Sequence, residues 1–398
     1  MSSDVIDPVW LVVFLLPVAA ASGWFAARWD QRDRSPGGKY DLPAAYFKGL
    51  NFLLNEQPDK AIEVFVKVLE VDSETVETHL AVGNLFRRRG EIERATRIHQ
   101  NLIARPNLDR GQRSQALFEL AQDYLKAGLF DRAENLFQEL SEVHQHSDQA
   151  LRALVHIYEQ EKEWEKAIAA SRKLSRISGV KLDPVIAHYA CELAEQALRD
   201  GDSVLAEAMA RRALNIDRNC VRATLALGQL HARAGNHKEA VRIWRRVGEQ
   251  DPAFLVEAVG NISASYRALG DEDGLYEFLD TALQRHGGDA FMLTLARMLE
   301  TRKGPQEAQD FVVDWLRRRP SVLGLYRLIE LNLAQATSEA AAQDLRILLG
   351  LIGRLAEEHQ GYTCGQCGFR GKQLHWQCPG CKGWNTIRPG SAAYDAAA

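Results

Sequence analysis

The chain has 398 residues, 46% of them hydrophobic and 26% charged, values that are ordinary for a folded soluble protein. A net charge of −4 and a pI of about 6.3 argue against a general nucleic-acid-binding protein, which usually contains a basic domain. Four of the six cysteines lie between Cys364 and Cys381. This clustering argues against the disulfide framework of a small secreted domain and favours a metal site in a reducing compartment.

The first 27 residues predict a transmembrane anchor. Residues 8–27 contain no charged side chain, and a helix of that length rises about 30 Å, the thickness of the hydrocarbon core. Acidic residues precede this stretch, whereas Arg28 and Arg32 follow it, which favours a retained anchor over a cleaved signal peptide. The rest of the chain is therefore predicted to face the cytoplasm, after a polar juxtamembrane linker at 28–42.

The middle of the chain repeats a tetratricopeptide pattern of paired helices. The small residue at which the first helix of a pair crosses the second falls at positions 49, 83, 121, 155, 194, 228, 262 and 296. Five of the seven spacings equal the repeat length of about 34 residues. Gly90, Gly128, Gly201 and Gly235 fall at the turn inside a pair, where a left-handed conformation is required.

This periodicity predicts an all-α superhelical solenoid of eight repeats at 43–322, followed by terminal capping helices at 323–359. Stacked helix pairs of this kind form a concave groove that binds peptides or proteins. Five basic residues recur at a position that usually faces the groove: Arg88, Lys126, Arg199, Arg233 and Arg267. They predict either a basic stripe for an acidic partner segment or solvated helix ends near the negative pole of each helix dipole.

Residues 360–389 contain the pattern CxxC-x10-CxxC, formed by Cys364, Cys367, Cys378 and Cys381. Two intervening residues let one tight turn direct two sulfurs at the same ion, and four thiolates suit a single zinc or iron ion. So short a domain needs a metal to fold, which favours a structural role. We expect Tyr362, Trp376 and Trp384 to pack this knuckle onto the last helices, and residues 390–398 to form a disordered tail.

Motifs for nucleotide binding, zinc proteolysis and serine hydrolysis (GxxxxGK[ST], GxGxxG after a strand, HExxH and GxSxG) are missing from the sequence. Cys191 and Cys220 are isolated in the sequence and are predicted to be small packing residues. We therefore predict an adaptor and not an enzyme.

The three parts, in this order, resemble the lipopolysaccharide assembly protein B family of Gram-negative bacteria. The resemblance covers nearly the whole chain, and the segments that carry it are 15–21, 49–54, 83–91, 187–194 and the knuckle up to Pro389. It implies a single-pass inner-membrane adaptor, with its C-terminal domain in the cytoplasm, that delivers the deacetylase LpxC to the protease FtsH and so limits lipopolysaccharide synthesis. It also implies restraint by a membrane-embedded partner and places the metal on the four knuckle cysteines.

Two other functions remain open at this point. One is a scaffold that gathers lipopolysaccharide synthesis and transport proteins at the inner membrane. The other is a rubredoxin-type redox sensor, which would require iron in the knuckle; no flavin or second cluster motif accompanies it in the sequence.

Overall fold

A computed structural model describes residues 42–55, 57–71, 75–143, 146–359 and 361–390, which belong to two compact units divided after Ala150. The predicted anchor (1–27), nearly all of the predicted linker (28–42) and the predicted tail beyond residue 390 lie outside the described residues. Within the described ranges, no helix combines the length and apolar character needed to cross a bilayer.

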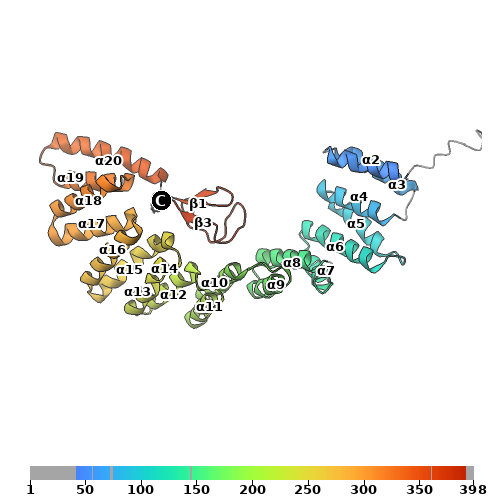
Figure 1. The fold of residues 1–398 in the computed structure, drawn as a ribbon, viewed down its shortest axis with the longest axis horizontal. Coiled ribbons are helices and arrows are strands. Elements are labelled where there is room, and N and C mark those ends of the chain that lie inside the picture. The colour runs from blue at the N-terminus through green and yellow to red at the C-terminus, as the bar shows by residue number, and fades with distance from the viewer. Residues whose placement is uncertain (1–41, 56, 72–74, 144–145, 360, 391–398) are drawn as a thin grey trace, which may run out of the picture. The chain divides into compact units, whose positions relative to one another are not determined.

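The first unit is built from three consecutive helix pairs (Figure 1). They are α2 (Leu42–Leu54) with α3 (Pro58–Val71), α4 (Val76–Arg88) with α5 (Ile92–Ile103), and α6 (Arg110–Lys126) with α7 (Phe130–Ser141).

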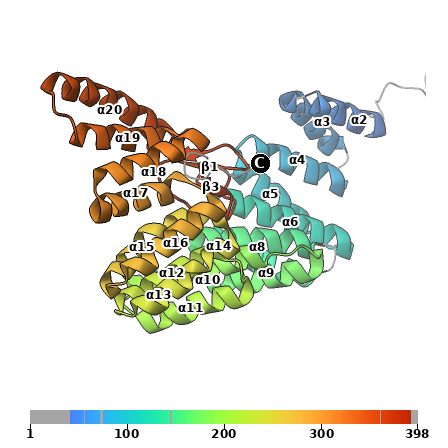
Figure 2. The ribbon, with the colours of Figure 1, turned by 60° about the vertical axis from the view of Figure 1, so that its left-hand side comes forward.

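The second unit continues this pattern, and consecutive pairs lie side by side in both views of the ribbon (Figures 1 and 2). Its pairs are α8 (Ser147–Glu161), which begins before the boundary, with α9 (Trp164–Ser178), α10 (Asp183–Arg199) with α11 (Ser203–Ile216), α12 (Val221–Arg233) with α13 (His237–Arg245), α15 (Leu255–Leu269) with α16 (Glu272–His286), α17 (Asp289–Lys303) with α18 (Pro305–Arg318), and α19 (Val322–Ala334) with α20 (Glu339–His359). The prediction of a tetratricopeptide solenoid is confirmed.

The turns inside the pairs explain the recurring glycines. Gly90, Gly128, Gly201 and Gly235 have φ of 82°, 74°, 83° and 78°, the left-handed region in which a side chain costs energy. The α8–α9 turn uses Lys162 instead, with φ of 59°. The tight turn is therefore preserved in this pair without glycine.

A second requirement for glycine is the close crossing of the two helices of a pair. A Cβ placed on Gly228 would lie 2.2 Å from Trp244 Nε1, and one on Gly83 would lie 2.3 Å from His99 Nε2. Trp244 is fully buried and its indole donates a hydrogen bond to the Leu225 carbonyl (3.1 Å). Each glycine thus leaves room for a large ring on the partner helix.

Polar groups hold two neighbouring pairs of the first unit together. Arg87, at the end of α4, donates to Glu119 Oε2 (2.6 Å) and Asp123 Oδ1 (2.8 Å) on α6. Asp123 also bonds His99 Nδ1 on α5 (2.6 Å), and the side chains of both residues are completely buried. Buried charges of this kind are tolerated because each is paired and hydrogen-bonded.

The succession of pairs is interrupted between the sixth pair, which ends with α13, and the seventh, which begins with α15. The short helix α14 (Val247–Gln250) and the 3-10 turn η1 (Pro252–Phe254) follow α13. Pro252 disfavours a helical conformation of the residue before it, and Asp251 is indeed extended, with φ of −160°. The break buries Phe254 in the core formed by α13, α15 and α16, and places η1 beside the C-terminal domain.

The C-terminal domain contains the only strands among the described residues, β1 (Tyr362–Cys364), β2 (Arg370–Gly371) and β3 (Ile387–Pro389). They form an antiparallel sheet in the order β2-β1-β3, with Tyr362 opposite Gly371 on one side and Pro389 on the other. We call residues 362–389 the knuckle. It lies inside the curve traced by α10–α18 of the second unit (Figure 1).

Candidate metal centre and its docking surface

Two similar loops present the four cysteines. In the first, the Gly368 amide donates to the Cys364 carbonyl (2.9 Å) and the Cys364 amide to the Phe369 carbonyl (2.8 Å). In the second, the Lys382 amide donates to the Cys378 carbonyl and the Cys378 amide donates to the Gly383 carbonyl (2.9 Å each). The residue after the second cysteine is left-handed in both, with φ of 75° at Gly368 and 60° at Lys382.

The sulfurs converge on one point. Cys364 Sγ lies 3.8 Å from Cys381 Sγ, Cys367 Sγ lies 3.6 Å from Cys378 Sγ, and all four lie within 4.8 Å of one another. A tetrahedral ion with metal–sulfur bonds of about 2.3 Å requires sulfur–sulfur distances of about 3.8 Å. The four cysteines therefore fit a single tetrahedral metal ion, as predicted.

The surroundings of Cys364 favour its thiolate, whereas at Cys367 the backbone hydrogen bond at Phe369 is outweighed by desolvation and by hydrogen bonds with the other three cysteines, which raise the thiol pKa to about 11. A hydrogen bond with the Thr386 hydroxyl (3.3 Å) is the main cause that lowers the pKa of Cys364 to about 6. Cys364 and Cys378 are buried, whereas Cys367 is exposed. With four protein ligands the site is closed, so the ion would hold the two loops together, and no ligand position is left for a substrate.

Trp384 joins the knuckle to the solenoid. Its ring stacks on His188 (centroids 5.5 Å apart) and meets Tyr189 and Trp164 edge to face (5.6 and 6.2 Å). Its indole donates to Glu159 Oε1 (2.7 Å), the same oxygen that accepts from the Tyr189 hydroxyl (2.6 Å). Burial and the Glu159 charge raise the pKa of Tyr189 far above its usual range, so this hydroxyl remains a donor.

A second group of contacts lies on η1 and α15. Trp376 stacks on Phe254 (centroids 5.4 Å apart), and the Arg388 guanidinium also lies over the Phe254 ring, 5.1 Å from its centroid. Arg388 also forms an ion pair with Asp251, and the Tyr362 hydroxyl donates to Glu257 Oε1 (2.7 Å). We call the solenoid residues that contact the knuckle the docking surface: Glu159, Trp164, His188, Tyr189, Asp251, Phe254 and Glu257.

His188 is enclosed between the two tryptophans of the knuckle. It stacks on Trp384 and lies 5.7 Å from Trp376, which leaves it 3% exposed. Burial, with a smaller contribution from the Arg222 charge, lowers the pKa of His188 to about 3. The imidazole is therefore neutral at pH 7, because burial penalises its charged form.

The prediction that Tyr362, Trp376 and Trp384 dock the knuckle is correct in its residues but wrong in its target. They contact α8, α9, α10, η1 and α15 of the second unit, and not the last helices α19 and α20. The reason is chemical: the inner side of α8–α10 offers Glu159 and the aromatic rings that indole groups need as partners. The sequence signal for this surface is His188-Tyr189, an aromatic pair within the segment 187–194.

The five predicted groove cations lie at the C-terminal ends of first helices. Arg88, Lys126, Arg199 and Arg233 are the last residues of α4, α6, α10 and α12, and Arg267 lies two residues before the end of α15. All five are exposed, and none forms an ion pair with another described residue. Both interpretations of these cations are compatible with this placement.

Cys191 and Cys220 come together although 29 positions separate them. Their sulfurs lie 3.8 Å apart, buried between α10 and the start of α12. The hydrogen bond between them, followed by burial, raises the pKa of Cys191 well above its usual value. This raised pKa and the apolar neighbours fit the predicted packing role.

A helical tetratricopeptide solenoid that holds a four-cysteine, rubredoxin-type knuckle defines the structural class of the protein. The knuckle, 362–389, matches the family model of the rubredoxin metal binding domain, and residues 118–178 and 191–252 match that of the tetratricopeptide repeat. Lipopolysaccharide assembly protein B of Escherichia coli K12 is 36% identical over 95% of this chain and 97% of its own, and that of Haemophilus influenzae is 34% identical over 95% and 98%. The chain belongs to the lipopolysaccharide assembly protein B family.

Proposed function

We propose that this protein is an inner-membrane adaptor that regulates lipopolysaccharide synthesis by promoting degradation of the deacetylase LpxC by the membrane protease FtsH. The observation that carries the proposal is the relationship to proteins named lipopolysaccharide assembly protein B over 95% of the chain. It spans both the solenoid and the knuckle, so the proposal concerns the whole architecture.

The physical argument is one of proximity. The proposal includes the anchor at 1–27 and a cytoplasmic orientation of the remainder. An adaptor tethered beside a membrane protease raises the effective concentration of a soluble cargo, up to about the millimolar range for a short tether. In the second unit, docking places the surface of the knuckle beside the surface of the solenoid helices. A composite surface of this kind suits the joint binding of two partners.

The decisive measurement is the half-life of LpxC in cells after protein synthesis is stopped, with the protein present and depleted. We expect depletion to lengthen the half-life several-fold, and re-expression of the intact chain to restore it. The variant Trp384→Ala, expressed to the same level, serves as the matched test of the docked knuckle and should restore turnover only partially. An unchanged half-life on depletion would rule out the proteolytic role.

The second candidate is a scaffold for lipopolysaccharide synthesis and transport proteins, which the word "assembly" in the names of the relatives favours. Under this alternative, depletion leaves LpxC turnover unchanged, while transport proteins cross-link to the intact chain in the membrane. The same pair of measurements therefore separates the two candidates.

The groove cations offer a narrower test. If they bind an acidic segment of a partner, reversing the charge of Arg199, Arg233 and Arg267 together should weaken capture of that partner. Because all three side chains are exposed, the helical circular dichroism should not change. Unchanged capture would leave the solvated-helix-end interpretation in place.

A further inference from the structure

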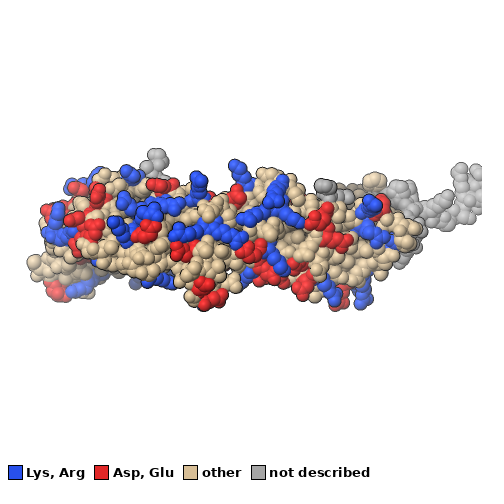
Figure 3. Space-filling model, turned by 90° about the horizontal axis from the view of Figure 1, so that it is seen from below, with Lys and Arg blue, Asp and Glu red and all other residues tan. Residues whose placement is uncertain are grey.

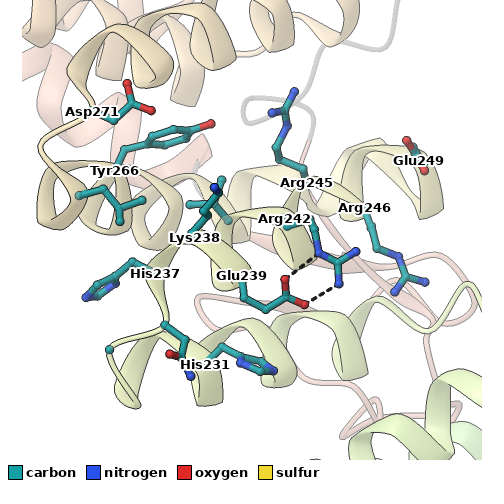
Figure 4. Close-up of a pocket in the computed structure, with 14 residues that line it drawn as sticks. His231, His237, Lys238, Glu239, Arg242, Arg245, Arg246, Glu249, Tyr266 and Asp271 are labelled. Carbon is teal, nitrogen blue, oxygen red and sulfur yellow. Dashed lines mark hydrogen bonds and ion pairs between the residues drawn. The ribbon is translucent and has the colours of Figure 1, made fainter.

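A large pocket lies at the sixth repeat, among residues other than those that contact the knuckle. It has a volume of about 1200 Å³ and is bounded by the α12–α13 turn, α13, α14 and the end of α15 (Figure 4). We call it the outer pocket. None of the residues that line it belongs to the docking surface, so the bound knuckle leaves it open.

Cations dominate the middle of the outer pocket. Lys238, Arg242 and Arg245 line it along α13, Arg246 follows at the end of this helix, and all four are exposed. The side chains of Lys238 and Arg246 form no hydrogen bond or ion pair with another residue that the structure describes, and the Arg245 guanidinium lies over the Phe278 ring, 5.9 Å from its centroid. Charged donors are thus available for a ligand.

The acidic residues of the lining are occupied or peripheral. Glu239 is held by Arg242 through two hydrogen bonds (2.5 and 2.7 Å). Asp271 caps α16 by accepting the Gly274 amide (2.8 Å). Glu249 lies at the edge, beyond Arg246 (Figure 4). Figure 3 shows Lys and Arg side chains gathered on the face of the molecule seen from below, with Asp and Glu side chains beside them, in a chain whose net charge is −4.

The pocket also offers apolar contacts. Leu269 is 45% exposed at its rim, and Tyr266 and Val241 contribute apolar surface beside it. The cations from Lys238 to Arg246 extend over about 12 Å of helix. This spread exceeds the size of one phosphate group but matches carboxylates a few residues apart on an extended segment, which advances about 3.3 Å per residue.

We propose that the outer pocket binds an acidic peptide segment of a partner protein, with carboxylates on Lys238, Arg245 and Arg246 and an apolar side chain on Leu269. Since the knuckle already covers the inner side of α8–α15, this pocket provides a protein-binding surface that stays free when the knuckle is docked. The proposal does not depend on which partner the protein serves, and it holds or fails independently of the proposed role in LpxC turnover.

The test uses the purified chain, with the knuckle loaded with metal, and a short fluorescein-labelled peptide of repeated Glu-Glu-Leu. Fluorescence anisotropy should show binding that a Gln-Gln-Leu peptide lacks. The double variant Arg245→Glu/Arg246→Glu should weaken binding by roughly tenfold or more, because it replaces two attractive charges by two repulsive ones.

The matched control is Arg317→Glu/Arg318→Glu. This is also an adjacent arginine pair, at the end of the second helix of another repeat, but it lies outside the pocket. We expect the control to bind the peptide like the unchanged chain. We expect Leu269→Asp to weaken peptide binding even though all the arginines are retained. Equal losses in both arginine pairs would overturn the proposal, because they would indicate non-specific attraction. Binding of phosphatidylglycerol vesicles through Arg245 and Arg246 without peptide binding would overturn it in favour of a membrane surface.

Discussion

Replacing Trp384 by alanine should release the knuckle from the solenoid without unfolding either part. The indole donates to the charged Glu159 carboxylate and contacts three aromatic rings at 5.5 to 6.2 Å. We assign about 1.5 kcal/mol to the charge-assisted hydrogen bond and about 0.5 kcal/mol to each ring contact, the lower ends of the usual ranges, because Trp384 is only partly buried. The docking equilibrium should therefore shift by about 3 kcal/mol, a factor of roughly 150.

His188 supplies the assay. It is 3% exposed beneath the two tryptophans, and its lowered pKa keeps it neutral and reactive toward diethyl pyrocarbonate at pH 7. The modification rate of His188 thus reports how often the knuckle leaves. Mass spectrometry should show a rate that rises about a hundredfold in Trp384→Ala, or until it reaches the rate of the exposed His156 in the same unit.

Two internal controls make the result interpretable. The rate at buried His99, in the other unit, should not change, which excludes general unfolding. Trp384→Phe keeps the ring contacts and loses only the hydrogen bond to Glu159, so it should raise the rate about tenfold. If His188 stays protected in Trp384→Ala, the contacts of this side chain do not hold the knuckle, and the estimate is refuted.

Three further predictions concern the metal, a repeat glycine and pH. Chelation of the metal should unfold the knuckle and leave the helical circular dichroism largely intact, because a domain of this size has too small a core without its ion; retained knuckle amide protection would contradict this. Gly83→Ala should lower the free energy of unfolding by about 2 kcal/mol in urea titration, since the new methyl meets His99, whereas Gly260→Ala, which has open space, should not destabilise. The pKa of His188 is depressed from 6.5 to about 3, so docking is fully stable above pH 6.5 and weakens as pH falls toward 3. At pH 5 the free energy of docking, followed by near-ultraviolet circular dichroism, should be less favourable by about 2 kcal/mol. This pH dependence should vanish in His188→Gln.

The repeats and the metal site could be predicted because both depend on local chemistry. Gly90 and Gly235 mark their turns by the left-handed backbone that the turns require, and the four cysteines mark their site by the short spacing within each loop. His99 shows the limit of such patterns. It occupies the position at which an aromatic residue is usual, and only the structure reveals that buried Asp123 and Arg87 compensate for its polarity.

The site of knuckle docking could not be predicted, because it depends on residues far apart in the sequence. Trp384 meets Glu159 across 225 positions, and Tyr362 meets Glu257 across 105. The prediction named the last helices as the docking site, yet these expose aliphatic side chains such as Leu348 and Leu351. Two indole groups, one phenol and one arginine find better partners among carboxylates and rings, and the break at Pro252 brings Phe254 within their reach. The partner of the knuckle is thus selected by side-chain chemistry and by a local interruption of the repeat, and neither is visible in the repeat pattern itself.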